Sequence, residues 1–204
     1  MRIIAGKYRG RRLRGPRGLD LRPTSDRLKE TLFNILSPIV SGSVVLDVFA
    51  GTGAIGFEAV SRGARQVVFV EDGREGLTLI RQNLDLCGIS SGCRLIQRDA
   101  FTALRQLARE AFQADIVYLD PPYQWQPYRD LMGVIFELGL AHEQTQVVFE
   151  HHRKADLPEN GPGCRRHRVV RQGDRCLSFY TAVTPEAGLI SNRADQAPAA
   201  EIDD

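Results

Sequence analysis

The chain has 204 residues, of which 43% are hydrophobic and 25% charged, and its formal net charge is +2 at pH 7. This length and apolar content suit one well-buried domain and are too small for two large ones. No run approaches the roughly 18 apolar residues of a membrane span, and the basic start of the chain lacks the apolar stretch of a signal peptide. The sequence therefore predicts a cytoplasmic protein that does not enter a membrane.

The cysteines show no Cys-x-x-Cys spacing. In a cytoplasmic chain, this indicates reduced thiols rather than a disulfide or zinc set, so we expect no metal. The four residues are Cys87, Cys93, Cys164 and Cys176.

Positive charge is concentrated at the start of the chain. The first 22 residues contain eight Lys and Arg against one acid, Asp20, which gives this segment a net charge of +7 and leaves −5 for the remainder. The asymmetry is typical of a basic extension, residues 1–22, that contacts a polyanion, although a solvated tail that keeps the chain soluble has the same composition. Gly6 and Gly10 are turn points, so residues 2–13 are predicted to form a small β-hairpin. Because the basic segment is expected to lie outside the parallel sheet, a chain without residues 1–13 is expected to fold.

A helix is predicted to follow the basic segment. In Arg22-Pro-Thr-Ser-Asp26, the hydroxyl of Thr24 or Ser25 can cap the free amides of the first turn. The helix is expected to end near Pro38. Its apolar face is formed by Leu28, Leu32, Ile35 and Leu36.

From residue 44 onward, short β-rich runs alternate with helical patterns, which indicates βαβ units and a mostly parallel sheet. Two further runs, 168–171 and 176–182, are predicted to form a closing antiparallel hairpin with a turn at residues 172–174. The prediction is an α/β domain, residues 23–184, with a Rossmann-like, seven-stranded, mostly parallel sheet. Residues 185–204, rich in Ala, Pro and acids, are predicted to be a disordered tail. The expected parallel strands are Val44–Phe49, Val67–Glu71, Arg94–Gln97, Asp115–Leu119 and Gln146–Glu150.

A glycine-rich loop joins the first of these strands to a helix, in Val44-Val-Leu-Asp-Val-Phe-Ala-Gly-Thr-Gly-Ala-Ile-Gly56. Its glycines allow the backbone to approach a ligand and the helix to pack close to the strand. G-x-G-x-x-G alone is shared with dinucleotide enzymes and with loops that bind nothing. Asp47 near the strand end favours the cationic ammonium of a methionine moiety over a pyrophosphate. Glu71, which ends the second strand, can accept hydrogen bonds from ribose hydroxyls in either class of site.

Asp99 follows the third predicted strand, at a carboxyl end where ligands collect in open α/β sheets. It can accept a hydrogen bond from an adenine amino group, or it can be the N-cap of a helix that starts at Ala100. The two roles are compatible, and the sequence leaves both open.

The most specific motif is Ile116-Val-Tyr-Leu-Asp-Pro-Pro-Tyr123, where a buried strand ends in an acceptor, a rigid turn and an aromatic ring. An exocyclic amine on a base is a poor nucleophile because its lone pair is delocalised into the ring. Asp120 can accept one N–H and the stiffened carbonyl of Pro121 the other, which directs the lone pair towards a methyl sulfonium. Tyr123 offers a stacking face for an extruded base. The tetrapeptide is also compatible with a plain Pro-Pro turn and a capping Asp.

This chemistry does not select the base, since adenine N6, cytosine N4 and guanine N2 all present an amine that Asp120 can hold. A DNA amino-methyltransferase shares Asp-Pro-Pro-Tyr but usually carries a separate target-recognition region, for which the chain has little room. A dinucleotide-dependent oxidoreductase would have to tolerate Asp47 and has no use for Asp-Pro-Pro-Tyr. A non-catalytic RNA-binding module would keep the basic segment but bind no methyl donor.

These motifs resemble the bacterial RsmD-like methyltransferases, which modify guanine N2 in small-subunit (16S) ribosomal RNA. The resemblance covers nearly the whole chain. The Arg-Pro-Thr and Phe-Asn-Ile-Leu segments are the most family-specific, whereas the glycine loop belongs to a whole superfamily. The matching segments are RIIAGKYRGR (2–11), LRPTSDRLKETLFNIL (21–36), LDVFAGTGAIGFEA (46–59) and DPPY (120–123).

The resemblance implies a monomeric, S-adenosylmethionine-dependent enzyme that acts on 16S ribosomal RNA within a small-subunit particle and contacts RNA through its basic segment. Asp72-Gly73 departs from the larger residue expected after Glu71. The expected contacts to the methyl donor are Asp47, Phe49, Ala50, Gly51, Thr52, Gly53, Glu71 and Asp99. The expected catalytic residues are Asp120, Pro121, Pro122 and Tyr123. The expected RNA contacts are Arg2, Lys7, Arg9, Arg11, Arg12 and Arg22.

Overall fold

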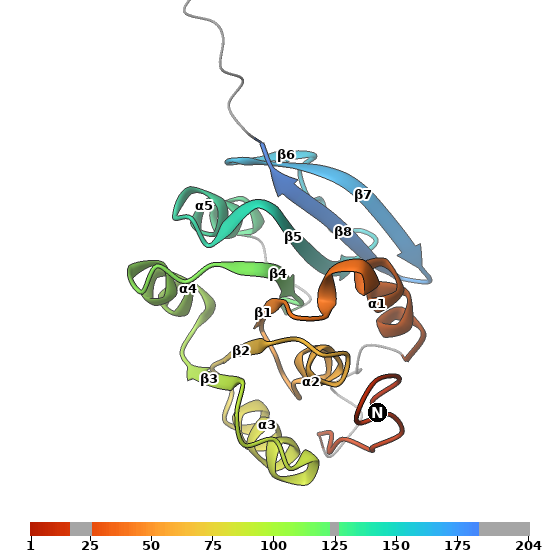
Figure 1. Ribbon diagram of the computed structural model, residues 1–204. Helices are drawn as coiled ribbons and strands as arrows, with labels where there is room; N and C mark the ends of the chain where they lie inside the picture. The colour runs from red at the N-terminus through yellow and green to blue at the C-terminus, as the bar shows by residue number, and fades with distance from the viewer. Residues whose placement is uncertain (17–25, 123–126, 184–204) are drawn as a thin grey trace, which may run out of the picture.

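The computed structural model describes residues 1–16, 26–122 and 127–183. Within these ranges one eight-stranded sheet is flanked by five helices, with α4 and α5 on one side and α1 and α2 on the other (Figure 1). None of the described helices has the length and apolar character needed to cross a membrane. The helices are α1 (Asp26–Val40), α2 (Ala54–Ser61), α3 (Arg74–Cys87), α4 (Ala100–Arg109) and α5 (Tyr128–Glu137). The strands are β1 (Val44–Val48), β2 (Gln66–Glu71), β3 (Cys93–Gln97), β4 (Ala114–Leu119), β5 (Ala141–His152), β6 (Asn160–Gly161), β7 (Cys164–Gln172) and β8 (Arg175–Ala182).

The strands lie in the order β3-β2-β1-β4-β5-β8-β7-β6. The first five pair in parallel, and β8, β7 and β6 continue the sheet by antiparallel pairing. The predicted α/β architecture and closing hairpin are confirmed, and the two-residue strand β6 adds to the seven strands expected. Gln172 pairs with Arg175 across a two-residue turn in which Gly173 has φ 61°.

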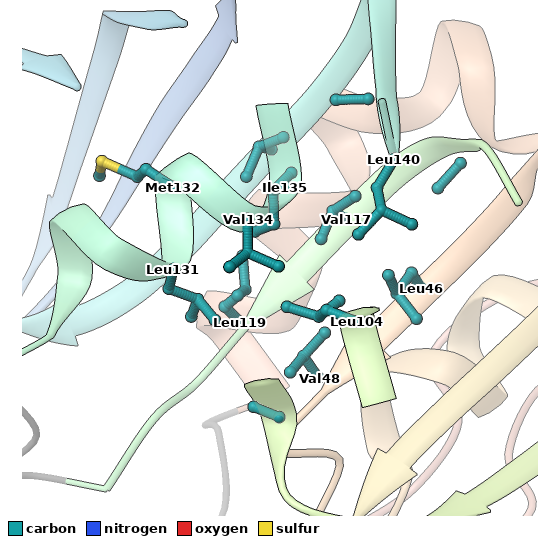
Figure 2. Close-up of a cluster of buried hydrophobic side chains, with 14 of the residues drawn as sticks. Leu46, Val48, Leu104, Val117, Leu119, Leu131, Met132, Val134, Ile135 and Leu140 are labelled. Carbon is teal, nitrogen blue, oxygen red and sulfur yellow. The ribbon is translucent and has the colours of Figure 1, made fainter. Parts of the chain in front are cut away.

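Both faces of the central sheet are buried. Successive side chains of a strand point to opposite faces, and here the side chains on both faces are apolar and are covered by helices. In β1, Leu46 and Val48 pack towards α4 and α5, whereas Val45 packs with residues of α1 and α2. Figure 2 shows the first cluster, in which Leu104 of α4 and Ile135 of α5 also take part. Strands buried on both faces are typical of parallel sheets covered by helices. This packing holds the strands in place, and with them the carboxyl ends of β1 and β4, from which the glycine loop and the Asp-Pro-Pro segment begin.

The parallel strands reverse their winding at β1, which has β2 on one side and β4 on the other. Ligands of open α/β sheets bind at the carboxyl ends of the strands, at such a switch point. The fold therefore brings the loop after β1 beside the segment after β4.

Helix α1 ends at Val40, near Pro38 as expected, and Pro38 lies inside its last turn. A proline inside a helix leaves the carbonyl four residues earlier without its amide partner. That carbonyl belongs to Asn34, and the hydroxyl of Ser37 donates to it at 3.0 Å. This substitute hydrogen bond accounts for the last turn of the helix. The expected caps Thr24 and Ser25, like the tail from residue 184 onward, lie outside the described residues.

The four cysteines are free thiols, and three of them are buried. Among the described residues, no group of three or more His, Cys, Asp and Glu is arranged to hold a metal ion.

Residues 1–16, here called the N-terminal loop, pack onto the helices of one face. Arg2 and Arg12 form an isolated antiparallel bridge, so the loop follows the predicted hairpin course without two regular strands. Ile3 and Leu13 are buried in the apolar cluster shared with α1 and α2. A Cβ on Gly6, which has φ 81°, would lie 1.8 Å from a backbone oxygen of α2, so only glycine fits this approach.

A buried carboxylate on α2 anchors the loop. Glu58 accepts the amides of Ile4 and Ala5 at 2.7 and 3.0 Å. The ammonium of Lys29 in α1 lies 3.7 Å from the same carboxylate and donates to the Arg2 carbonyl oxygen at 2.5 Å. The side chains of Lys29 and Glu58 have no exposed surface. Burial lowers the pKa of Lys29, and the nearby Glu58 opposes this shift.

These contacts argue against the expectation that residues 1–13 can be removed without affecting the fold, and a truncated protein would test it. We propose that the N-terminal loop is a packed part of the α/β domain.

Glu58→Gln is expected to lower the free energy of unfolding by about 3 kcal/mol, because it leaves the Lys29 ammonium buried without an opposite charge. Chemical denaturation measures the change. The matched control is Glu30→Gln, on an exposed glutamate of α1, which should stay within about 0.5 kcal/mol of the wild type. Equal unfolding midpoints for the two variants would contradict the anchoring role of Glu58.

Candidate active site

A cleft of about 570 Å³ opens at the carboxyl ends of β1, β2 and β4. Its volume is within the range of small-molecule sites. The glycine loop after β1, the first turn of α3 and the Asp-Pro-Pro segment after β4 form its walls. Of the residues predicted for the site, those that line the cleft are Asp47, Phe49, Ala50, Gly51, Thr52, Glu71, Asp120, Pro121 and Pro122.

The other predicted site residues are placed differently. Gly53 and Asp99 do not line the cleft. Tyr123 and Arg22 lie outside the described residues, so their predicted stacking and RNA contacts stay predictions.

The loop after β1 has an unusual backbone. Phe49 adopts φ 61° and Gly51 φ 54°. The left-handed region is rare for a residue with a large side chain and costs of order 1–2 kcal/mol. A Cβ on Gly51 would meet no atom within 4 Å, so the space beside this backbone is open, as a close approach to a ligand requires.

The two following glycines serve packing. A Cβ on Gly53 would lie 2.7 Å from the ring of Phe57, and one on Gly56 would lie 2.2 Å from the ring of Phe69. Both rings belong to the buried cluster on the α2 side of the sheet. These glycines therefore let α2 sit close to the strands.

Asp47 supplies the cap that α2 lacks. The N-cap residue, Gly53, has no side chain to offer, and the Asp47 carboxylate accepts the amide of Gly56 at 2.9 Å instead. Only 2% of Asp47 is exposed. Burial raises its pKa well above the usual value, the Gly56 amide opposes this, and the carboxylates of Asp120 and Glu71 raise it further. Asp47 thus combines a structural hydrogen bond with an acidic group in the cleft wall.

Glu71 couples two walls of the cleft. Its Oε2 accepts the amide of Gly51 at 2.6 Å, and its Oε1 accepts the amide of Gly73 at 2.8 Å. Each carboxylate oxygen has a second acceptor position, so hydrogen bonds to ribose hydroxyls remain possible. Gly76 was missed by the sequence analysis, although a Cβ there would lie 2.8 Å from both Glu71 Cδ and the Gly51 carbonyl oxygen. Gly76 is the third residue of α3, and a glycine inside a helix, where alanine is more stable, was the available signal.

Asp99 is the N-cap of α4. Its carboxylate accepts the amide of Thr102 at 3.0 Å, which confirms the capping role. Hydrogen bonding by Thr102 lowers the pKa of Asp99. The neighbours Arg98 and Ala100 line the cleft. A contact between Asp99 and adenine therefore stays a proposal.

A buried ionic network adjoins Asp120. Arg175 Nη1 lies 3.2 Å from Asp120 Oδ1 and 3.3 Å from Glu150 Oε1. The Glu150 side chain is fully buried, and its Oε2 accepts the hydroxyl of Tyr118. Burial and the Glu150 carboxylate raise the pKa of Asp120 to about 7, and Arg175 opposes the rise. A group with this pKa changes charge near neutral pH.

The sequence analysis missed Arg175, which also lines the cleft. It is the first residue of β8 and pairs with His152 at the carboxyl end of β5. The predicted turn of the hairpin at residues 172–174 was the signal that could have located it, because an antiparallel return brings the start of the last strand to this edge.

Two of the predicted RNA contacts are engaged by the protein itself. Arg2 forms an exposed ion pair with Asp26 at 3.2 Å. Arg11 donates from Nη1 to the Leu86 carbonyl oxygen at 2.8 Å. These arginines therefore also hold the N-terminal loop against α1 and α3.

Lys7, Arg9 and Arg12 are the other cations predicted to contact RNA that the structure describes. Lys7 Nζ, like Arg11 Cζ, lies 5.3 Å from the centre of the Tyr8 ring, an arrangement that gives cation–π attraction. Arg9 and Arg12 are exposed, and their side chains form no hydrogen bond or ion pair with the described part of the chain. They are the cations best placed to meet an external partner.

Comparison with known proteins identifies the family. A sequence model described as "Conserved hypothetical protein 95" matches residues 1–181. The chain belongs to this family. Its relatives include the ribosomal RNA small subunit methyltransferase D of Haemophilus influenzae, 36% identical over 163 residues, with 78% of this chain and 84% of that protein covered. The Escherichia coli K12 protein of the same name is 32% identical over 180 residues, with 88% and 89% covered.

A solved structure supports the same relationship. The yhhF protein from Escherichia coli superimposes with a TM-score of 0.78 at 31% identity, covering 89% of this chain and 97% of that one. The resemblance to RsmD-like methyltransferases, and with it the expected fold class, is confirmed.

Asp47→Asn separates the two properties of Asp47, the hydrogen bond to the Gly56 amide and the cost of a buried negative charge. The pKa of Asp47 is higher in the folded state than the value of about 3.9 of an unfolded aspartate. Ionisation of Asp47 therefore destabilises the fold as the pH rises from the unfolded pKa to the folded one. Asparagine keeps the acceptor for the Gly56 amide and never ionises. We expect the free energy of unfolding of the variant, relative to the wild type, to increase between about pH 5 and about pH 8 in urea titrations. Asp85→Asn, on an exposed residue of α3, is the control. The same pH dependence in both variants would contradict the assignment.

Proposed function

We propose that this chain transfers the methyl group of S-adenosylmethionine to the N2 amine of a guanine in small-subunit ribosomal RNA. The observation that carries the proposal is that one cleft contains the glycine loop and Glu71 together with Asp120 and Pro121. Groups suited to a methyl donor and groups suited to an amine acceptor therefore share one space. The names of the relatives support ribosomal RNA as the substrate. The choice of guanine N2 rests on the family resemblance alone.

The residues of the cleft fit the donor by charge and shape. The methionine ammonium suits the acidic wall at Asp47, and the ribose hydroxyls suit the carboxylate of Glu71. The open space beside Gly51 admits a ligand close to the backbone. When bound, S-adenosylmethionine supplies an electrophilic methyl group on a sulfonium.

Asp120 and Pro121 prepare the acceptor. The charged carboxylate of Asp120 accepts one N–H of the amine, and the Pro121 carbonyl accepts the other, so that the nitrogen lone pair is free and directed. As the nitrogen gains the methyl group it loses a proton, and a carboxylate with a pKa of about 7 is suited to hold that proton. Tyr123 is assigned the stacking of the extruded base.

The N-terminal loop is assigned to RNA phosphate. Its exposed cations Arg9 and Arg12 lie on the same packed loop as Lys7 and Tyr8, and a cation beside an aromatic ring suits single-stranded RNA. We propose that a monomer acts on 16S ribosomal RNA within a small-subunit particle.

The deciding experiment is methyl transfer from radiolabelled S-adenosylmethionine to naked 16S ribosomal RNA, to small-subunit particles and to DNA, followed by nucleoside analysis. We expect N2-methylguanosine, with particles as the better substrate. Label in N6-methyladenine, in N4-methylcytosine or in DNA would contradict the proposed acceptor. If no methyl group is transferred to naked RNA, to particles or to DNA, the proposed function is contradicted.

Asp120→Ala is expected to lower the single-turnover rate of methyl transfer by about 100-fold or more, because a positioning and electrostatic group is lost. The dissociation constant for S-adenosylmethionine, measured by calorimetry, should change by less than about threefold, since the residue orients the acceptor. The matched control is Asp130→Ala, on an exposed residue of α5, which should keep the wild-type rate. An unchanged rate in Asp120→Ala would reduce this residue to a strand-terminal cap.

The double variant Arg9→Gln/Arg12→Gln is expected to bind RNA more weakly and to show a slope of log affinity against log salt that is shallower by about 1.5, because two phosphate contacts are lost. Filter binding over a range of salt concentrations measures both quantities. The control Arg105→Gln/Arg109→Gln removes two exposed cations from α4, on the other face of the sheet. Identical salt slopes in the two double variants would move the RNA contact away from the N-terminal loop.

A further inference from the structure

Arg175 stands between two carboxylates beside the proposed acceptor site. We propose that Arg175 is a positioning residue for methyl transfer, which keeps the Asp120 carboxylate charged and turned to receive the amine. The inference rests on the proposed function of Asp120 and adds to it the first residue of β8, which lies next to β5 in the antiparallel hairpin.

The geometry leaves half of the Asp120 carboxylate available. Arg175 Nη1 contacts Oδ1 of Asp120 at 3.2 Å, and no described residue donates to Oδ2. The Asp120 side chain keeps 28% of its surface exposed within the cleft. An amine that enters the cleft therefore finds one oxygen held by the guanidinium and the other open.

Arg175 is itself held in place from behind. The same Nη1 atom lies 3.3 Å from Oε1 of the fully buried Glu150, whose second oxygen accepts the Tyr118 hydroxyl. An arginine with two fixed partners loses little further freedom when substrate binds. The buried Glu150 thus serves as the support that keeps the guanidinium against Asp120.

Without Arg175, the groups around Asp120 would oppose the ionisation of its carboxyl group. Charged or titratable groups face Asp120 from β1, β4, β5, α5 and β8, and within the described part of the chain Arg175 is the only cation among them. When two carboxylates lie close together with no cation beside them, one of the two carboxylates tends to become protonated. A protonated Asp120 would no longer offer two acceptor oxygens. The facing groups are Asp47, Tyr118, Glu150, Tyr128 and Arg175.

The pH dependence of single-turnover methyl transfer, measured with full-length protein and small-subunit particles, tests this role. The wild-type rate should rise with pH through a midpoint near 7, where Asp120 ionises. Arg175→Gln should move the midpoint up by about one pH unit or more, and Arg175→Lys should move it less. Glu150→Gln removes the opposing negative charge but keeps a side-chain oxygen that can accept from Arg175, so it should move the midpoint down. Opposite shifts from two members of one network are not expected from a loss of structure.

Arg171→Gln is the matched control, because it removes an equal charge from an exposed position in β7 and should leave the midpoint in place. An Arg175→Gln protein with a reduced rate and the wild-type midpoint would show a purely structural role and overturn the inference. If that variant does not fold, the midpoints of Arg175→Lys and Glu150→Gln decide instead. Shifts in opposite directions support the inference, and wild-type midpoints in both variants overturn it. An inactive wild type would instead overturn the proposed function, so the two failures are distinguishable.

Discussion

The parallel pairing of β1 with β4 is the constraint on which the candidate site depends. Its register sets Asp47 beside Tyr118 and Val48 beside Leu119. The Asp120 amide still lies 3.4 Å from the Val48 carbonyl oxygen. The glycine loop and the Asp-Pro-Pro segment therefore leave the sheet at adjacent points and in the same direction. Backbone register alone brings the two motifs together, before any side chain contributes.

Acidic side chains gather in and beside the cleft, and the fold compensates them in two ways. A buried or half-buried carboxylate is tolerated only when hydrogen bonds or opposite charges compensate it. Asp47 and Glu71 are met by backbone amides, and Asp120 and Glu150 by Arg175. The first two are thereby built into the loops that would surround a donor. Asp120 is held by a side chain, which leaves its charge adjustable. This contrast separates groups suited to binding from the group suited to chemistry.

Local patterns were sufficient to predict the parallel strands, the closing hairpin and both loop motifs, because apolar runs and glycine or proline breaks mark them directly. Their meeting in one cleft followed from the general rule for open α/β sheets. Local patterns predicted the hairpin that contains Arg175 but not its place in the site, which also requires the pairing of β8 with β5. The same limit applies to the N-terminal loop, whose docking depends on Glu58, a residue with no local indication of burial. At Pro38, the Ser37 hydroxyl takes the place of the missing amide at the Asn34 carbonyl oxygen.

The β1–β4 pairing also has a kinetic consequence. The Val44 amide donates to the Asp115 carboxylate at 2.7 Å across 71 residues of chain. Closing a loop of this length is entropically costly and makes parallel pairing slow compared with local hairpins and helices. During synthesis, a ribosome-bound chain that has not yet exposed β4 has the glycine loop but no second wall for the cleft. Binding between these two walls requires the β1–β4 pairing, so ligand binding would report that this pairing has formed.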